Sequence, residues 1–111
     1  MIQNCNLTSK KCVPCEGGTP ALSAIKAQQL LNNLKDWQIS ADHKAISKKF
    51  SFKNFRQTME FANAIAYIAN KEGHHPDLKL GYNYCEVLFT THAIDGLSEN
   101  DFICAAKVDL L

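Results

Sequence analysis

The sequence predicts an α+β fold in which a four-stranded antiparallel sheet has three helices packed on one face. Two observations lead to this prediction. Apolar residues follow a helical period in three segments and alternate in the segments between them, in the order α-β-β-α-β-β-α. The connections between consecutive strands are short, as in hairpins, so the strands run antiparallel, and an antiparallel sheet can carry its helices on one face.

Residues 1–21 are expected to form an irregular N-terminal leader, and residues 22–111 a single domain. Two prolines and two glycines fall within residues 14–20, and the leader has no apolar period. A chain of 111 residues is long enough to bury a core. The N-terminus lacks the apolar segment of a signal peptide, and the longest apolar run, residues 64–69, is too short to cross a bilayer. These features favour a soluble, cytoplasmic protein with no membrane partner.

The first helix and the first hairpin follow this leader. Ser23 is a good N-cap, and the helix is predicted over residues 24–36. Residues 43–52 alternate between apolar and polar side chains, which predicts a half-buried strand. A shorter strand over residues 37–40 is expected to pair with it across residues 41–44. The apolar stripe of the helix consists of Ala27, Leu30, Leu31 and Leu34.

The second helix has clear signals at both ends. Asn54 can cap its start, with Gln57 three residues later in a pattern similar to a capping box. Gly73 is suited to end the helix in a left-handed conformation, and Pro76 prevents the helix from restarting. The face expected to be buried contains Phe55, Met59, Ala62, Ile65, Ala66 and Ala69.

Two further strands and a third helix complete the pattern. The strands are predicted over residues 79–82 and 84–91. The third helix is expected to open after Ser98, with Asp101 at its third position and an apolar repeat behind it. In the longer strand one face is formed by Cys85, Val87, Phe89 and Thr91.

Three of the four histidines are candidates for a shared site. His74 and His75 lie side by side on the turn after the second helix, and the last hairpin would return His92 to the same end of the sheet. An imidazole with a pKa of about 6.5 can donate or accept a proton at neutral pH. In the alternative interpretation, one of the pair bonds locally and the other is solvated, and spacing alone leaves the two about equal. His43 lies in a polar turn and is interpreted as a surface residue.

Asp101 and two threonines each admit two interpretations. An acid at the start of a helix is favoured as a cap by about two to one over a role in orienting a pocket histidine, although the two roles are compatible. Thr90 and Thr91 directly precede His92. They could present polar groups to a ligand, or they could simply be β-branched residues that finish a strand.

Charge and cysteine content exclude several classes of protein. Twelve basic and eleven acidic side chains nearly cancel, so the basic surface of a nucleic-acid-binding protein is absent. Five cysteines cannot all pair within one chain, which favours free thiols in a reducing compartment. Cys12 and Cys15 form a C-x-x-C pair without a second such pair, and adjacent histidines do not fit zinc-ligand spacing. Metal binding through this pair is the weaker interpretation, and we expect no metal.

Several separated segments together resemble one family, the pterin-4a-carbinolamine dehydratases. They are the sequence HHP at residues 74–76, the aromatic Tyr82, the sequence TTH at 90–92 and the sequence GLSENDF at 96–102. Residues 22–37 and the sequence FSFKNF at 50–55 are similar to the opening of the same family. The resemblance covers residues 22–111. Asn70 stands where the family commonly has a charged residue.

The resemblance implies an activity and a set of site residues. It implies elimination of water from 4a-hydroxytetrahydropterin to give quinonoid dihydropterin, which recycles the cofactor of aromatic amino acid hydroxylases. The pterin is the substrate, so no cofactor is implied, and members form homodimers or homotetramers. Some members also serve as a binding cofactor of a transcription factor, so a non-catalytic dimerisation role is the alternative. The implied catalytic residues are His74, His75, His92 and Asp101, and the implied substrate-binding residues are Gly73, His74, His75, Pro76, Thr90, Thr91, His92 and Ala93.

Overall fold

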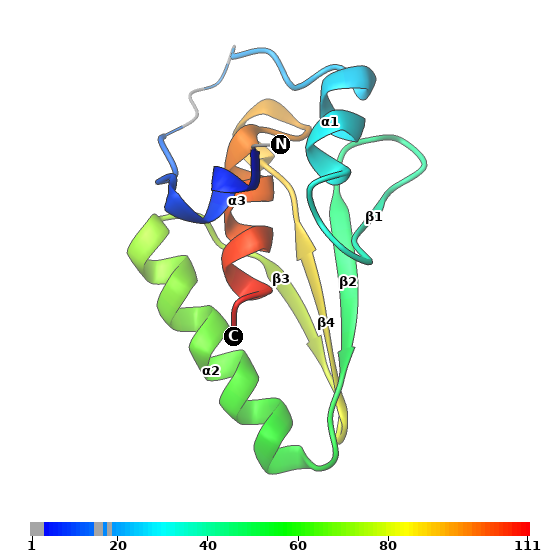
Figure 1. Ribbon diagram of the computed structural model, residues 1–111, viewed down its shortest axis with the longest axis vertical. Helices are drawn as coiled ribbons and strands as arrows, with labels where there is room; N and C mark the ends of the chain where they lie inside the picture. Colours follow the sequence, from blue (N-terminus) through cyan, green and yellow to red (C-terminus); the bar gives the residue numbers. More distant parts are fainter. Residues whose placement is uncertain (1–3, 15–16, 18) are drawn as a thin grey trace.

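The computed structural model describes residues 4–14, 17 and 19–111, and within them it contains the predicted sheet and helices. Figure 1 shows the three helices gathered along one side of the sheet. The order of elements confirms the predicted α-β-β-α-β-β-α sequence. The elements are α1 (Ala24–Leu31), β1 (Gln38–Ile39), β2 (Ile46–Ser51), α2 (Phe55–Glu72), β3 (Asp77–Leu80), β4 (Tyr84–Phe89) and α3 (Glu99–Val108), with 3-10 helices η1 (Asn4–Ser9) and η2 (His92–Ile94).

The sheet consists of two hairpins joined through their longer strands. The strand order is β1-β2-β4-β3, and every pairing is antiparallel. In the central pair, Ile46 lies opposite Phe89 at one end and Ser51 lies opposite Tyr84 at the other. Strand β3 begins at Asp77, two residues earlier than predicted. The chain therefore passes from the end of α2 into the edge strand within four residues.

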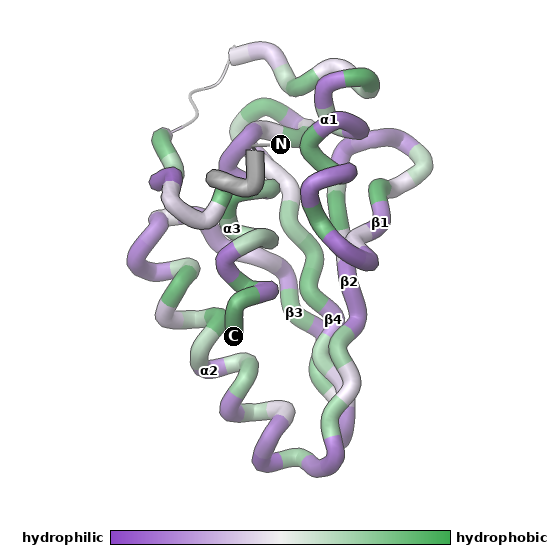
Figure 2. Tube along the Cα trace, in the orientation of Figure 1, coloured by the Kyte–Doolittle hydropathy of each residue, from purple (hydrophilic) through white to green (hydrophobic). Residues whose placement is uncertain are grey.

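One face of the sheet is buried under the helices, as the alternation predicted. Cys85, Val87 and Phe89 of β4 are almost completely buried, whereas Glu86 between them is exposed. Helix α3 packs against this face with most of its side chains buried. Figure 2 shows hydrophobic and hydrophilic residues alternating along α2, as expected of a helix with one buried face.

Helix α2 keeps its predicted ends but buries a slightly different face. Asn54 accepts a hydrogen bond from the Gln57 N–H, and Gly73 ends the helix in the left-handed region at φ 68°. The predicted burial of Phe55 and Ala66 is wrong, because both are exposed. Thr58 is fully buried instead, and its hydroxyl is placed to donate to the backbone oxygens of Asn54 and Tyr82. The buried residues of the helix are Thr58, Ala62, Ile65 and Ala69.

The N-terminal segment differs from the expected irregular leader at residues 4–9, which form η1. Leu7 is 3% exposed and belongs to the core. Helix α1 begins after the predicted N-cap Ser23 but ends at Leu31, five residues early. The Trp37 ring beyond it is buried, and its Nε1 donates to Asp109, 3.0 Å away. Within the described residues, no helix combines the length and the apolar character that a membrane span requires.

The central position of α2 in the core can be tested with two matched isoleucines. Ile65→Ala removes a side chain that is 1% exposed, and we expect the free energy of unfolding to fall by about 2–5 kcal/mol because a cavity remains. Ile25 on α1 is 74% exposed, so Ile25→Ala should change this free energy by less than about 0.5 kcal/mol. Denaturant unfolding followed by circular dichroism measures both. Equal losses in the two variants would contradict the described packing.

Candidate active site

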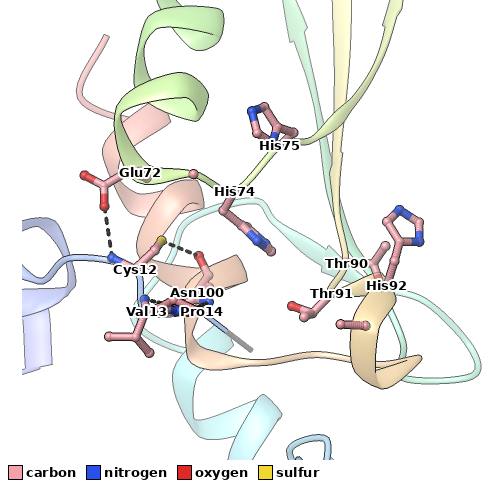
Figure 3. A pocket seen from close by; sticks show the side chains of 12 residues that line it. Cys12, Val13, Pro14, Glu72, His74, His75, Thr90, Thr91, His92 and Asn100 are labelled. Atoms are coloured by element: carbon pink, nitrogen blue, oxygen red, sulfur yellow. Dashed lines mark hydrogen bonds between the residues drawn. The ribbon is translucent and has the colours of Figure 1, made fainter. Parts of the chain in front are cut away.

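A pocket of about 560 Å³ opens where α2 ends, β4 ends and α3 begins. Figure 3 shows His74, His75 and His92 around it. The structure thus brings the three candidate histidines to one cavity, as expected from the hairpin return. The lining residues are Cys12, Val13, Pro14, Glu72, Gly73, His74, His75, Thr90, Thr91, His92, Ala93 and Asn100.

The turn after α2 directs the two adjacent histidines differently. The left-handed Gly73 reverses the chain, and the His74 N–H donates to the Ala69 oxygen at 3.2 Å. The His74 side chain is 12% exposed and reaches Asp101, whereas His75 is exposed. Neighbouring residues in an extended segment point to opposite sides, so one imidazole is held and the other is open to solvent. Pro76 does not line the pocket, contrary to expectation.

The carboxylate of Asp101 is the buried centre of the site. It is fully buried and uses both of its oxygens. Oδ1 lies 2.5 Å from Nε2 of His74. Oδ2 accepts hydrogen bonds from the Thr91 hydroxyl at 2.8 Å and from the Ser98 N–H at 3.0 Å. A buried carboxylate needs such partners, because an unpaired one is costly to remove from water.

These contacts show that Asp101 both caps α3 and contacts a pocket histidine. Its bond to the Ser98 N–H is half of a capping box at the start of the helix. The same carboxylate reaches His74 at the end of α2 and Thr91 just beyond β4. The hydroxyls of Thr91 and Ser98 also lie 2.7 Å apart. Asp101 therefore has both of the roles that the sequence left open, the helix cap and the contact with a pocket histidine.

The His74 ring is held by a carboxylate and lies nearly parallel to an aromatic ring. Its plane lies at 11° to that of Phe89, with ring centroids 6.0 Å apart. When the Asp101 carboxylate is ionised it can only accept hydrogen bonds, and Nε2 of His74 is then the donor. In the neutral ring, Nδ1 then keeps its lone pair and is the basic nitrogen.

The other predicted side chains at the pocket differ in their exposure and in the hydrogen bonds that they already make. His92 is exposed at the start of η2, so its ring can reach a ligand in the open part of the cavity. The Thr90 hydroxyl donates to the Lys44 oxygen at 2.5 Å. The Thr90 hydroxyl is therefore already bonded, so mainly the backbone of Thr90 can contact a ligand. The Thr91 hydroxyl is already bonded to Asp101. His43, in the β1–β2 turn, does not line the pocket.

One wall of the pocket, formed by residues 12–14, was not predicted from the sequence. The Cys12 N–H donates to Glu72 at 2.9 Å. Val13 and Asn100 exchange two hydrogen bonds, from the Val13 N–H at 3.0 Å and from the Asn100 amide to the Val13 oxygen at 2.6 Å. A segment without periodicity carries no signal for such long-range contacts.

Glu72 places a negative charge at the edge of the pocket. The Lys107 Nζ donates to its Oε2 at 2.5 Å, and this bond, helped by the Cys12 N–H, lowers the pKa of Glu72 below its usual value. No group of three or more potential metal ligands occurs among the residues that the structure describes. The C-x-x-C prediction includes Cys15, which lies outside those residues.

The fold and the pocket together define an α+β protein with an imidazole–carboxylate site. A model of the family "Pterin 4 alpha carbinolamine dehydratase" matches residues 20–111. The chain belongs to this family. A protein of Nitrosomonas europaea, whose name assigns it to the pterin-4-alpha-carbinolamine dehydratases, is 58% identical over all of this chain and 97% of its own. A protein of Legionella pneumophila with the same assignment is 55% identical over 96% of this chain and 95% of its own.

Solved structures share the fold. A transcriptional coactivator/pterin dehydratase from Brucella melitensis has a TM-score of 0.77 and 31% identity, covering 81% of this chain and 96% of its own. A pterin dehydratase-like protein, described as a RuBisCO assembly factor in the alpha-carboxysome, has a TM-score of 0.60 and 26% identity, covering 68% of this chain and 87% of its own.

The pairing of Glu72 with Lys107 predicts a pH-dependent stability. Since the pKa of Glu72 is lowered from 4.5 in the folded state, its contribution is present above that pH and is lost as the pH falls through the lowered pKa. We expect Glu72→Gln to reduce the free energy of unfolding by about 1 kcal/mol at pH 7, and this difference to shrink below pH 4.5. Urea unfolding at several pH values measures it.

The matched control is Glu60→Gln, at an exposed position on the same helix. This variant should follow the wild-type pH dependence. A Glu72→Gln deficit that persisted undiminished at low pH would contradict the assigned ion pair.

Proposed function

We propose that this protein eliminates water from a 4a-hydroxytetrahydropterin to give quinonoid dihydropterin. The observation that carries the proposal is the meeting of three imidazoles in one open pocket, one of them bonded to a buried carboxylate. Family membership supports the substrate class, and the pocket volume suits a small heterocycle.

The residues at hand suit the chemistry of this reaction. Loss of hydroxide from a carbinolamine requires a proton delivered to the leaving oxygen and a proton removed from a ring nitrogen. Positioned imidazoles can perform both steps, and general acid–base catalysis typically contributes about 10²–10⁴-fold in rate. The reaction requires neither a covalent intermediate nor a redox cofactor, so we propose that the pterin binds as substrate with no cofactor.

We assign distinct roles to the histidines. His74 removes the ring proton at Nδ1, since its Nε2 proton is directed at Asp101, whose charge stabilises the imidazolium that forms. His92, on the open side, delivers a proton to the leaving hydroxyl. His75 binds and orients the pterin. The backbone of Gly73, Thr90 and Ala93 completes the substrate contacts.

The product and the cysteines suggest the cellular setting. Quinonoid dihydropterin arises from the spent cofactor of aromatic amino acid hydroxylases, so we propose that the protein serves such a hydroxylase. Cys12, Cys85 and Cys104 are free thiols, which is consistent with a reducing compartment such as the cytoplasm.

We further propose that the protein forms a homodimer or homotetramer through α2 and β3. Strand β3 is an edge strand whose four residues are all exposed. Such an edge pairs readily with another strand. Large apolar side chains that remain exposed on or beside these elements are Phe55, Tyr67, Leu78, Leu80 and Tyr82.

The same exposed surface supports a second candidate function, that of a non-catalytic binding protein. The Brucella melitensis relative is described as a transcriptional coactivator as well as a pterin dehydratase. A partner protein could cover the apolar side chains of α2 in place of a second copy. This function would not require the histidines, so histidine variants separate the two candidates.

Histidine substitution tests the dehydratase directly. His74→Asn and His92→Asn remove one proton-transfer group each, and we expect turnover of a freshly generated carbinolamine to fall about 10²-fold or more in each variant. Stopped-flow absorbance of quinonoid dihydropterin formation measures the rate, and circular dichroism verifies folding.

His43→Asn is the matched control, because His43 is outside the pocket and has a positive φ of 59°, which asparagine tolerates. It should retain wild-type turnover. Unchanged rates in both pocket variants would exclude histidine catalysis and favour the binding function.

The oligomer is tested by placing a charge on the exposed surface. Tyr67→Glu on α2 and Leu78→Glu on β3 should each lower the mass observed by sedimentation velocity, because a buried charge opposes association. Ile25→Glu changes an exposed apolar residue of α1 and should leave the mass unchanged. A wild-type protein that sediments as a monomer at micromolar concentration would refute this proposal.

A further inference from the structure

Two thiols from opposite ends of the chain meet beside the pocket. The Sγ atoms of Cys12 and Cys104 lie 3.4 Å apart, although 92 positions separate them in the sequence. Cys12 lines the pocket on the N-terminal segment, whereas Cys104 is fully buried in the middle of α3. A disulfide requires about 2.05 Å between the sulfurs, so an approach of about 1.4 Å would join them.

The contacts around Cys12 hold it in this position. Its N–H is bonded to Glu72, and the next residue, Val13, exchanges two hydrogen bonds with Asn100. The Cys12 Sγ also lies 3.7 Å from the Asn100 oxygen. These contacts fix residues 12–13 against α2 and α3, so the two sulfurs are held close to each other.

The surroundings make the two thiols unequal. The hydrogen bond with the Cys104 thiol lowers the pKa of Cys12, and the charge of Lys107 acts in the same direction, against burial and the charge of Glu72. That hydrogen bond and burial raise the pKa of Cys104. Cys12 is thus the thiol that ionises first, and it faces the pocket from which a small oxidant can enter.

We propose that Cys12 and Cys104 form a peroxide-responsive dithiol pair, in which Cys12 is the reacting thiol and Cys104 the resolving thiol. The inference is independent of the dehydratase activity, since it rests on the distance between the two sulfurs and on the groups that surround them. It assigns a modification site to the wall of the pocket, with hydrogen peroxide as the oxidant.

The reaction proceeds in two balanced steps. The Cys12 thiolate attacks one peroxide oxygen, so an S–O bond forms, the O–O bond breaks, and hydroxide leaves and takes a proton to become water. Cys104 then attacks the sulfenic sulfur of Cys12, so the S–S bond forms, the S–O bond breaks, and hydroxide leaves with the Cys104 proton as a second water. The two sulfurs together lose two electrons, and the peroxide gains them. A dithiol reductant reverses the bond by thiol–disulfide exchange.

The bond would tie the N-terminal segment covalently to α3. It would close a loop that spans most of the chain, which restricts the unfolded state and raises stability. It would also draw the Cys12 side chain away from the cavity and toward the interior of the protein. The proposed modification therefore changes both the stability and the wall of the pocket.

The test is controlled oxidation of the full chain. We expect one equivalent of hydrogen peroxide to consume two thiols, and tryptic mass spectrometry without reduction to find a peptide linked through Cys12 and Cys104. The melting temperature should rise by several degrees and return to its starting value after dithiothreitol. Cys12→Ser should abolish the linked peptide and the rise in melting temperature.

Cys85→Ala is the matched control, because Cys85 is also fully buried but lies in β4 away from the pocket lining. It should form the linked peptide as the wild type does. Cys104→Ala should stop the reaction at an oxidised Cys12 without a link. Oxidation of Cys12 to sulfinic acid in the wild type, or a link from Cys12 to Cys15, to Cys5 or to a second copy of the chain, would overturn the proposal.

Discussion

The buried carboxylate of Asp101 is the interaction on which the site depends. Its oxygens bond the start of α3, Thr91 two residues beyond β4, and the histidine after α2, so three parts of the chain converge on one side chain. A buried charge is tolerated only when such partners surround it, and loss of one partner typically costs several kcal/mol. The Asp101 carboxylate, which caps α3, thereby also fixes the segments after α2 and β4 that surround the pocket.

This arrangement separates a rigid part of the pocket from an open part. Asp101 bonds the His74 ring, and the ring lies nearly parallel to that of Phe89, so its orientation is set before any ligand binds. His75 and His92 are exposed and can adapt to a ligand. A fixed imidazole together with adaptable ones would suit the proposed reaction, in which two protons move at different atoms of one heterocycle.

The surface proposed for association is distinct from the pocket. The exposed apolar side chains belong to α2 and to the edge strand β3, and none of them lines the cavity. The solved relatives are described as a coactivator/dehydratase in one case and as an assembly factor in another. One fold can support such different activities because its outer surface and its pocket can change separately.

The sequence by itself determined the order of the elements, their caps and the buried face of β4. These features depend on neighbouring residues, as with Ser23, Asn54 and Gly73, whose cap geometry is local. The resemblance of the sequence to the dehydratase family also pointed to the histidines that line the pocket. Tertiary structure alone decided that Thr58 is buried while Phe55 is exposed, that residues 12–14 form a wall, and that Cys12 meets Cys104. Such contacts join residues far apart in the chain, and no local period records which distant groups a folded backbone brings together.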